Sequence, residues 1–218
     1  RDSSVTGVQT CALPISSSGT TGKPTVVGYT QNDIDEWATS LARGFTSVGL
    51  GKDDILQVSY GYGLFTGGLG AHYGSEKLGA TVLPTSSGNT ERQLELMKDL
   101  GITAIACTPS YFLYMIETAR KIGLSIKDDT KLKMGFFGAE PWSEELKKRI
   151  EEESGIKAYD IYGTSEMSGP LFTECAEQQG IHIWADKFLV EILDPDTEEP
   201  IPDGESGELV ITTLTKEA

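Results

Sequence analysis

Residues 102–122, ITAIACTPSYFLYMIETARKI, contain the local pattern on which the fold depends. Ile102–Cys107 is a short apolar run of strand length, bounded by turn and cap signals. Thr108 followed by Pro109 is typical of a helix N-cap and a first helical position. The stretch therefore predicts a buried strand that leads directly into a helix ending near Ile122.

The same alternation of strand and helix patterns continues on both sides of this unit. Further strands are predicted at Thr25–Tyr29, Ile55–Tyr60, Thr81–Pro84, Leu132–Phe137 and Ala158–Tyr162. Helices are predicted between these strands. One follows an apolar stripe from Ile34 to Val48, one lies in a Gly-rich stretch ending at Leu78, and one runs from Ser143 to Glu153. A further helix begins at Thr90, whose spacing from Gln93 matches a capping box. The alternation predicts an α/β fold with a mostly parallel sheet and flanking helices.

The pattern changes after Gly169. Strands without intervening helices are predicted at Ile181–Trp184, Phe188–Leu193 and Glu208–Leu214, joined by turn sequences such as Asp194-Pro195-Asp196. We therefore expect an α/β part at residues 16–169 and a small antiparallel β subdomain, truncated at its C-terminal side, at residues 170–218.

Composition and charge exclude several classes of protein. The 218 residues contain 38% apolar and 23% charged residues, which is typical of a globular chain. A formal net charge of −15 argues against nucleic acid as a partner, because phosphate backbones select basic surfaces. No apolar run approaches the roughly 20 residues that span a bilayer. Three widely spaced cysteines fit a reducing compartment, so a cytoplasmic location is expected.

The first fifteen residues differ in character from the rest. Val5–Ile15, VTGVQTCALPI, follows neither a strand nor a helix period and resembles a translated sequencing-library adapter. The alternative is a natural terminus without regular structure. We expect residues 1–15 to be a non-native tail and the native sequence to begin near Ser16.

A loop suited to anions follows this tail. Residues 16–25, SSSGTTGKPT, combine hydroxyl groups, two glycines and Lys23 next to a predicted strand. Glycine allows backbone amides to approach an anion, hydroxyls add donors, and lysine adds a positive charge. The spacing is not that of a Walker A loop, because only two residues separate Gly19 from Gly22 and a proline follows the lysine.

Two more motifs directly follow predicted strands. Gly138-Ala139-Glu140-Pro141-Trp142 lies between a strand and a helix, and Tyr162-Gly163-Thr164-Ser165-Glu166 ends another strand. Ligands of α/β proteins bind at the carboxyl ends of parallel strands, and a carboxylate there can hold a hard cation. Strand-to-helix punctuation and a solvated glutamate are the alternative explanations.

The loop closely resembles the phosphate-binding loop of the adenylate-forming superfamily, and the two later motifs resemble further motifs of that superfamily. The resemblance implies that Lys23, Ser165 and Glu166 take part in catalysis, with Glu166 as the Mg²⁺ ligand. It implies an ATP site made by Ser17, Ser18, Gly19, Thr20, Thr21, Gly22, Lys23, Gly138, Ala139, Glu140, Pro141, Asp160, Ile161, Tyr162, Gly163, Thr164 and Ser165.

A narrower resemblance concerns residues 60–74, YGYGLFTGGLGAHYG, which are similar to the phenylacetate–CoA ligase branch of this superfamily. The resemblance implies that aromatic residues here wall an aryl-acid pocket. The pocket residues expected are Tyr60, Phe65, Gly138, Gly163 and Pro170. For Tyr60 and Phe65, ordinary core packing remains the alternative.

The resemblance implies a two-step reaction with ATP, Mg²⁺ and CoA. An aryl acid would attack the α-phosphorus of ATP to give an acyl-adenylate and pyrophosphate, and CoA would then displace AMP. Members of the superfamily continue into a ribose-binding motif and a mobile C-terminal domain, and another segment precedes the phosphate loop. We therefore expect this chain to be a central fragment with little ligase turnover by itself.

Several alternatives remain open from the sequence. The chain could adenylate another acid or serve another acceptor, such as a carrier protein, or it could be a nucleotide-binding module without catalysis. A P-loop phosphotransferase fits less well, because the loop spacing is wrong. A structural zinc site could use Cys107, Cys175 and His182, with Glu174 as a further ligand, although such sites usually have tighter spacing. A homodimer is also open.

Overall fold

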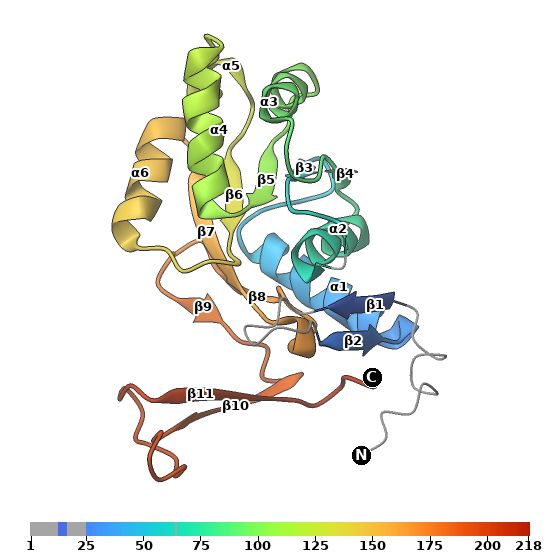
Figure 1. Cartoon of the computed structure of the whole chain (residues 1–218), viewed down its shortest axis with the longest axis vertical. Helices are drawn as coiled ribbons and strands as arrows, with labels where there is room; N and C mark the ends of the chain where they lie inside the picture. Colours follow the sequence, from blue (N-terminus) through green and yellow to red (C-terminus); the bar gives the residue numbers. More distant parts are fainter. Residues whose placement is uncertain (1–12, 17–24, 64) are drawn as a thin grey trace.

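A seven-stranded sheet forms the centre of the molecule in a computed structural model that describes residues 13–16, 25–63 and 65–218. Its strand order is β4-β3-β5-β6-β7-β8-β9 (Figure 1). The strands are β3 (Ile55–Val58), β4 (Thr81–Leu83), β5 (Ala104–Cys107), β6 (Met134–Phe137), β7 (Lys157–Tyr162), β8 (Phe172–Glu174) and β9 (Ile181–His182). Strands β3 to β7 pair in parallel, whereas β8 and β9 are antiparallel. The predicted α/β fold with a mostly parallel sheet is confirmed.

Helices cover both faces of the sheet. They are α1 (Gln31–Ser47), α2 (Thr66–Leu78), α3 (Thr90–Asp99), α4 (Pro109–Lys121), α5 (Ile126–Asp129) and α6 (Glu144–Ser154). Strand β5 shows the division, because Ala104 and Ala106 belong to the core beneath α1 while Ile105 and Cys107 belong to the core beneath α3, α4 and α6. This follows from the two-residue period of a strand.

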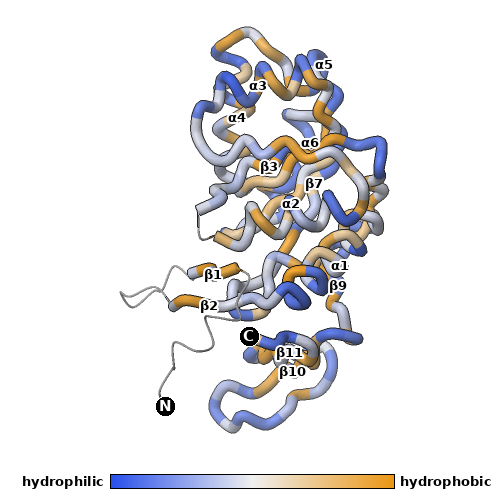
Figure 2. Tube along the Cα trace, turned by 90° about the vertical axis from the view of Figure 1, so that its right-hand side faces the viewer, coloured by the Kyte–Doolittle hydropathy of each residue, from blue (hydrophilic) through white to orange (hydrophobic). Residues whose placement is uncertain are grey.

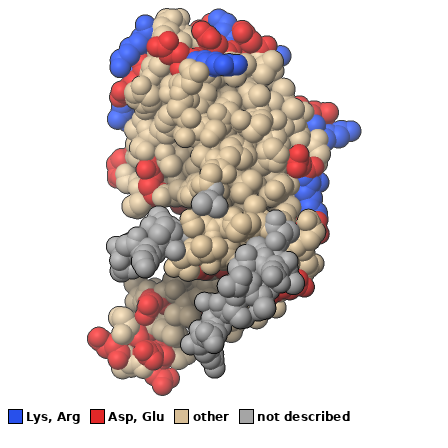
Figure 3. Space-filling model, turned by 45° about the vertical axis from the view of Figure 1, so that its right-hand side comes forward, with Lys and Arg blue, Asp and Glu red and all other residues tan. Residues whose placement is uncertain are grey.

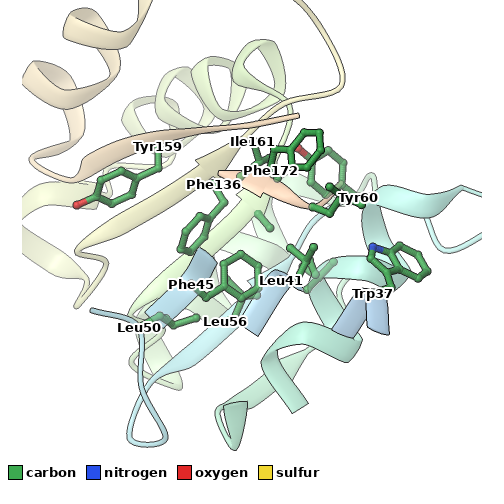
Figure 4. Packing of buried hydrophobic residues seen from close by; sticks show 14 of the residues in the cluster. Trp37, Leu41, Phe45, Leu50, Leu56, Tyr60, Phe136, Tyr159, Ile161 and Phe172 are labelled. Atoms are coloured by element: carbon green, nitrogen blue, oxygen red, sulfur yellow. The ribbon is translucent and has the colours of Figure 1, made fainter. Parts of the chain in front are cut away.

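The core beneath α1 joins the helix to the middle of the sheet. Leu41 and Phe45 of α1 lie close to the strands, whereas the Trp37 ring packs beside Tyr29 and Tyr73 (Figure 4). The rings of Phe45 and Phe136 have centroids 4.4 Å apart, and neither side chain is exposed. These contacts fix α1 against β6, whose end carries part of the candidate site.

Hydroxyl side chains cap the starts of two helices, α4 and α6. Thr108 Oγ1 accepts a hydrogen bond from the Tyr111 backbone N–H at 3.2 Å, and Pro109 is the first residue of α4. Ser143 caps α6 in the same way, accepting from the Leu146 N–H at 3.3 Å. The N-cap predicted at Thr108 is confirmed, whereas Ser143, predicted as the start of a helix, is the N-cap of that helix.

The predicted capping box at Thr90 and Gln93 is wrong. Asn89 occupies the N-cap of α3 and makes no side-chain cap hydrogen bond. The Gln93 side chain is buried instead, where its Oε1 accepts from Ser59 Oγ at 2.7 Å and its Nε2 donates to the Gly88 carbonyl at 2.6 Å. Tertiary hydrogen bonds therefore replace the local one.

Two hairpins lie beside the main sheet (Figures 1 and 2). Strands β1 (Leu13–Ser16) and β2 (Val26–Tyr29) form one, and β10 (Phe188–Leu193) and β11 (Glu208–Thr213) form the other. Ile15, within the segment predicted to be adapter-derived, is fully buried in the core. Because β8 and β9 belong to the main sheet, the change from parallel to antiparallel pairing occurs inside that sheet. The adapter origin of residues 1–15 and the division at residue 169 stay predictions.

The distribution of charge is uneven. The loop from residue 194 to 207 between β10 and β11 contains Asp194, Asp196, Glu198, Glu199, Asp203 and Glu205 and no lysine or arginine. On the face shown in Figure 3, the charged side chains at the lower end of the molecule are all acidic, whereas acidic and basic side chains are mixed at the upper end. Across the parts of the chain that the structure describes, no helix is long and apolar enough to cross a membrane.

Candidate functional site

The candidate site lies at the carboxyl ends of β6 and β7. These strands are parallel neighbours, with Phe137 paired to Asp160, so the segments that follow them meet at one edge of the sheet. Gly138 makes this meeting possible. A Cβ atom on Gly138 would lie 2.2 Å from the Ile161 carbonyl oxygen, which is backbone and cannot move aside cheaply.

A cavity of about 260 Å³ opens at this edge. Its wall includes four of the five residues predicted for the acid pocket, together with the residues of the Thr164–Glu166 motif. The lining residues are Ser16, Tyr60, Phe65, Thr66, Gly67, Ala139, Ile161, Gly163, Thr164, Ser165, Glu166 and Pro170. We call it the first cavity. The fifth predicted residue, Gly138, does not line it.

A second cavity, of about 460 Å³, lies next to the first. It is lined by Ala139, Glu140, Pro141, Trp142, Asp160, Ile161, Tyr162, Gly163 and Ile181. Ala139, Ile161 and Gly163 belong to both walls, so the two cavities adjoin. The second cavity thus gathers seven residues that the sequence assigned to nucleotide binding, from both post-strand motifs.

Of the predicted phosphate loop, residues 16–25, the structure describes only Ser16 and Thr25. Ser17, Ser18, Gly19, Thr20, Thr21, Gly22 and Lys23 lie outside the described residues. Ser16, directly before them, lines the first cavity and pairs with Val26 in the β1–β2 hairpin. Of the residues that precede this segment, Ser16 is therefore the one that the structure places at the first cavity.

The two predicted aromatic residues differ in how firmly they are held. Tyr60 is 4% exposed, and its hydroxyl donates to the Cys107 carbonyl at 2.7 Å. Burial raises the pKa of the Tyr60 phenol well above its ordinary value. Phe65 is 37% exposed, and its ring centroid lies 5.9 Å from that of Tyr60. Tyr60 is thus a buried core residue that also lines the first cavity, whereas Phe65 forms a more accessible part of its wall.

The turn that carries Ser165 and Glu166 is held by contacts from distant elements. The Tyr29 hydroxyl, at the end of β2, donates to the Ser165 carbonyl at 2.5 Å. The Ser165 hydroxyl is 3.5 Å from Thr66 Oγ1, at the start of α2. Glu166 itself is exposed at the cavity. The turn is therefore fixed through its backbone, and its carboxylate faces solvent, where it could bind a cation.

The segment after β6 is also held in place. Ala139 has φ of 68°, in the left-handed region that residues other than glycine rarely occupy. Glu140 Oε1 accepts from the Ser110 backbone N–H at 2.7 Å, and its Oε2 accepts from the Ser110 hydroxyl at 2.9 Å. The Glu140 carboxylate thus ties this segment to the first turn of α4.

Sequence reasoning missed a buried ion pair behind the second cavity. Lys147 Nζ of α6 lies 2.7 Å from Glu174 Oε2 of β8, and the two side chains are 7% and 5% exposed. Glu174 Oε2 also accepts from the Asp160 backbone N–H at 2.8 Å. Burial raises the pKa of the Asp160 carboxyl, a hydrogen bond involving Trp142 opposes the rise, and the charge of Glu174 adds to it. No local signal distinguished Lys147 from its solvated neighbours on α6.

The structure gives no support to a zinc site. Within residues 13–16, 25–63 and 65–218, no group of three or more His, Cys, Asp and Glu side chains could hold a metal ion. Cys107 is buried, Cys175 is partly exposed, and His182 is exposed. Glu174, the suggested fourth ligand, is already paired with Lys147. The structure therefore does not bring Cys107, Cys175 and His182 together.

Comparisons with known proteins identify the family of the chain. The family model described as AMP-binding enzyme matches residues 6–214, and the chain belongs to this family. It is 55% identical to the phenylacetate-coenzyme A ligase of Pseudomonas putida and 54% identical to that of Escherichia coli K12, in each case over 93% of this chain. These matches cover 46% and 47% of the two enzymes, so the chain spans about half the length of the curated relatives it matches.

Solved structures show the same fold. A 2-hydroxyisobutyryl-CoA ligase in complex with 2-HIB-AMP and CoA superposes with a TM-score of 0.89 at 28% identity, covering 95% of this chain and 46% of that one.

Proposed function

We propose that the protein containing this chain is an ATP-dependent, AMP-forming CoA ligase that activates phenylacetate. The observation that carries the proposal is the 55% identity to a phenylacetate-coenzyme A ligase over 93% of the chain. Residues Tyr60, Phe65 and Pro170 in the wall of the first cavity support an aromatic acid as the substrate. The CoA acceptor is supported by the names of these relatives, which favour CoA over a carrier protein.

The two adjoining cavities suit the two substrates of the first step. The acid would occupy the first cavity and the adenine of ATP the second, so that the carboxylate and the α-phosphorus meet near Gly163, which both walls share. Holding both reactants in this geometry removes much of the entropic barrier. One oxygen of the acid then bonds to phosphorus, and pyrophosphate leaves. CoA thiolate subsequently attacks the acyl carbon and releases AMP.

Glu166 fits a role in neutralising the charge of the phosphates. Its carboxylate is exposed at the first cavity, and Mg²⁺ prefers such oxygen ligands together with phosphates and water. A bound Mg²⁺ would supply charge neutralisation to the pyrophosphate. Lys23 would add a further positive charge from the phosphate loop. The hydrogen bond from the Tyr29 hydroxyl to the Ser165 carbonyl would hold the motif in position.

The test is acid-dependent ATP–pyrophosphate exchange by the protein encoded by the uninterrupted gene. Phenylacetate should stimulate exchange in the presence of Mg²⁺, and Glu166→Ala should lower the rate by roughly a hundredfold or more, the scale known for losing one preorganised electrostatic contact to a transition state. Glu152→Ala, an exposed carboxylate on α6, is the matched control and should retain the rate. Folded protein that shows no exchange with phenylacetate or another aryl acid would refute the proposal.

The cytoplasmic location, a homodimer and the assignment of residues 16–169 to substrate binding stay predictions from the sequence. The expected weakness of turnover by the 218-residue chain alone belongs with them. Acyl-CoA formation by the 218-residue chain, measured beside that of the full gene product, tests the expected weakness of turnover.

A further inference from the structure

Two residues at the start of α2 are in unusually close contact. Phe65 is the N-cap of this helix and Gly67 its second residue, and both line the first cavity. A Cβ atom placed on Gly67 would lie 2.4 Å from Phe65 Cε1, 3.1 Å from Cζ and 3.2 Å from Cδ1. The Phe65 ring therefore lies across the space that any side chain at position 67 would occupy.

Two other glycines of this helix, Gly70 and Gly74, serve a different purpose. A Cβ on Gly70 would meet the Trp37 ring at 2.5 Å, and one on Gly74 would meet Leu41 at 2.4 Å. These two glycines let α2 pack closely against α1. At Gly67, by contrast, the three nearest atoms all belong to Phe65 and none to another element.

The backbone at Gly67 does not require glycine. Its φ lies outside the left-handed range, and it is part of regular helix, so alanine can adopt the same conformation. The three atoms nearest to the added Cβ all belong to the ring of Phe65, a side chain that is 37% exposed. Alanine at position 67 should therefore move the ring and leave the helix in place.

We propose that Gly67 is a specificity-determining residue, because the missing Cβ sets where the Phe65 ring stands in the wall of the acid cavity. The inference rests on the proposed function and adds to it the residue that adjusts the aryl wall. To pass from 2.4 Å to the roughly 3.5 Å at which carbon atoms make favourable contact, the ring must shift by about 1 Å. A shift of this size changes the fit of a planar ring more than that of an alkyl chain.

The experiment is a double-mutant cycle in the full gene product with Gly67→Ala, Phe65→Ala and the double variant. Acid-dependent pyrophosphate exchange gives kcat/KM for phenylacetate and for butyrate, an acid of the same carboxymethyl type without the ring. Gly67→Ala should change the phenylacetate-to-butyrate ratio by roughly tenfold, the scale of a changed apolar pocket contact, and leave the KM for ATP within about twofold. In the Phe65→Ala background the same substitution should leave the ratio unchanged, because no ring remains to be displaced.

Gly63→Ala is the matched control, since a Cβ there meets no atom within 4 Å, and it should behave as wild type. Thermal melting of each variant identifies any loss of folded protein. The proposal is overturned if Gly67→Ala keeps the wild-type ratio, or if it shifts the ratio equally with and without Phe65. Absence of acid-dependent exchange in the wild type would overturn the proposed function, and this inference with it. That result is distinct from an unshifted variant of an active enzyme.

Discussion

The buried pair of Lys147 and Glu174 allows a prediction of large magnitude. Lys147→Met removes the ammonium group, so the Glu174 carboxylate, 5% exposed, loses the two hydrogen bonds of 2.8 and 2.7 Å that Lys147 donates to it. Breaking a buried ion pair from one side costs about 3–5 kcal/mol, because an uncompensated charge stays in the interior. We expect the free energy of unfolding to fall by that amount.

The assay is urea unfolding followed by tryptophan fluorescence. Trp142 reports on the region directly, since Lys147 Nζ lies 5.9 Å from its ring centroid. Arg120→Met is the control, because its pair with Glu153 is on the surface, with side chains 58% and 22% exposed. Surface pairs contribute about 0–1 kcal/mol, so the control should stay within that range.

A second variant separates the ion pair from simple loss of packing. Lys147→Met combined with Glu174→Gln leaves no buried charge, and the glutamine oxygen can still accept the Asp160 N–H that Glu174 accepts at 2.8 Å. The double variant should therefore be more stable than Lys147→Met alone. A loss below about 1 kcal/mol for Lys147→Met, equal to that of the surface control, would refute the reasoning.

Three further predictions concern the walls of the two cavities. Tyr60→Phe should lower the free energy of unfolding by about 1–3 kcal/mol in urea titrations, because the buried Cys107 carbonyl loses its donor. Gly163→Ala should cost about 1–3 kcal/mol or more in the same titrations and reduce exchange activity, because its Cβ would lie 2.6 Å from Gly169 Cα, which is backbone. Asp160 has a pKa raised above 3.8, so its contribution to stability is present below that pH and is lost as pH rises through the folded-state pKa. Urea titrations of Asp160→Asn between pH 4 and 7 should show the variant gaining stability relative to wild type as pH rises, and a constant difference would contradict this.

The order of strands and helices was predictable because its signals are local. Thr108, the predicted N-cap, and Ser143, at the predicted start of the next helix, each cap with a hydrogen bond from a residue three positions further along the chain. Gln93 shows the limit. Its amide has as many donors and acceptors as a capping box needs, but a buried cluster with Ser59 and the Gly88 carbonyl offers it more hydrogen bonds than the helix end.

The location of the site was predictable for a topological reason. Motifs that follow parallel strands reach the same edge of the sheet. Glu140 and Gly163 therefore line one cavity, although they are 23 positions apart in the sequence. The ion pair of Lys147 and Glu174 was not predictable in this way. A lysine on a helix rich in charged residues is normally solvated, and only the fold shows that β8 brings a carboxylate beneath it.

The shape of the site depends on close backbone approaches, which no side-chain pattern reveals. Gly138 permits contact with the Ile161 carbonyl, and Gly163 permits contact with Gly169 and Pro170. Because Gly163 lies in the walls of both cavities, the space between the proposed acid and nucleotide sites is bounded there by main chain, which has few ways to relax. At Gly67 the opposing atoms belong to one movable ring. Substitution at Gly163 should therefore impair activity with every acid, whereas substitution at Gly67 should change which acid is preferred.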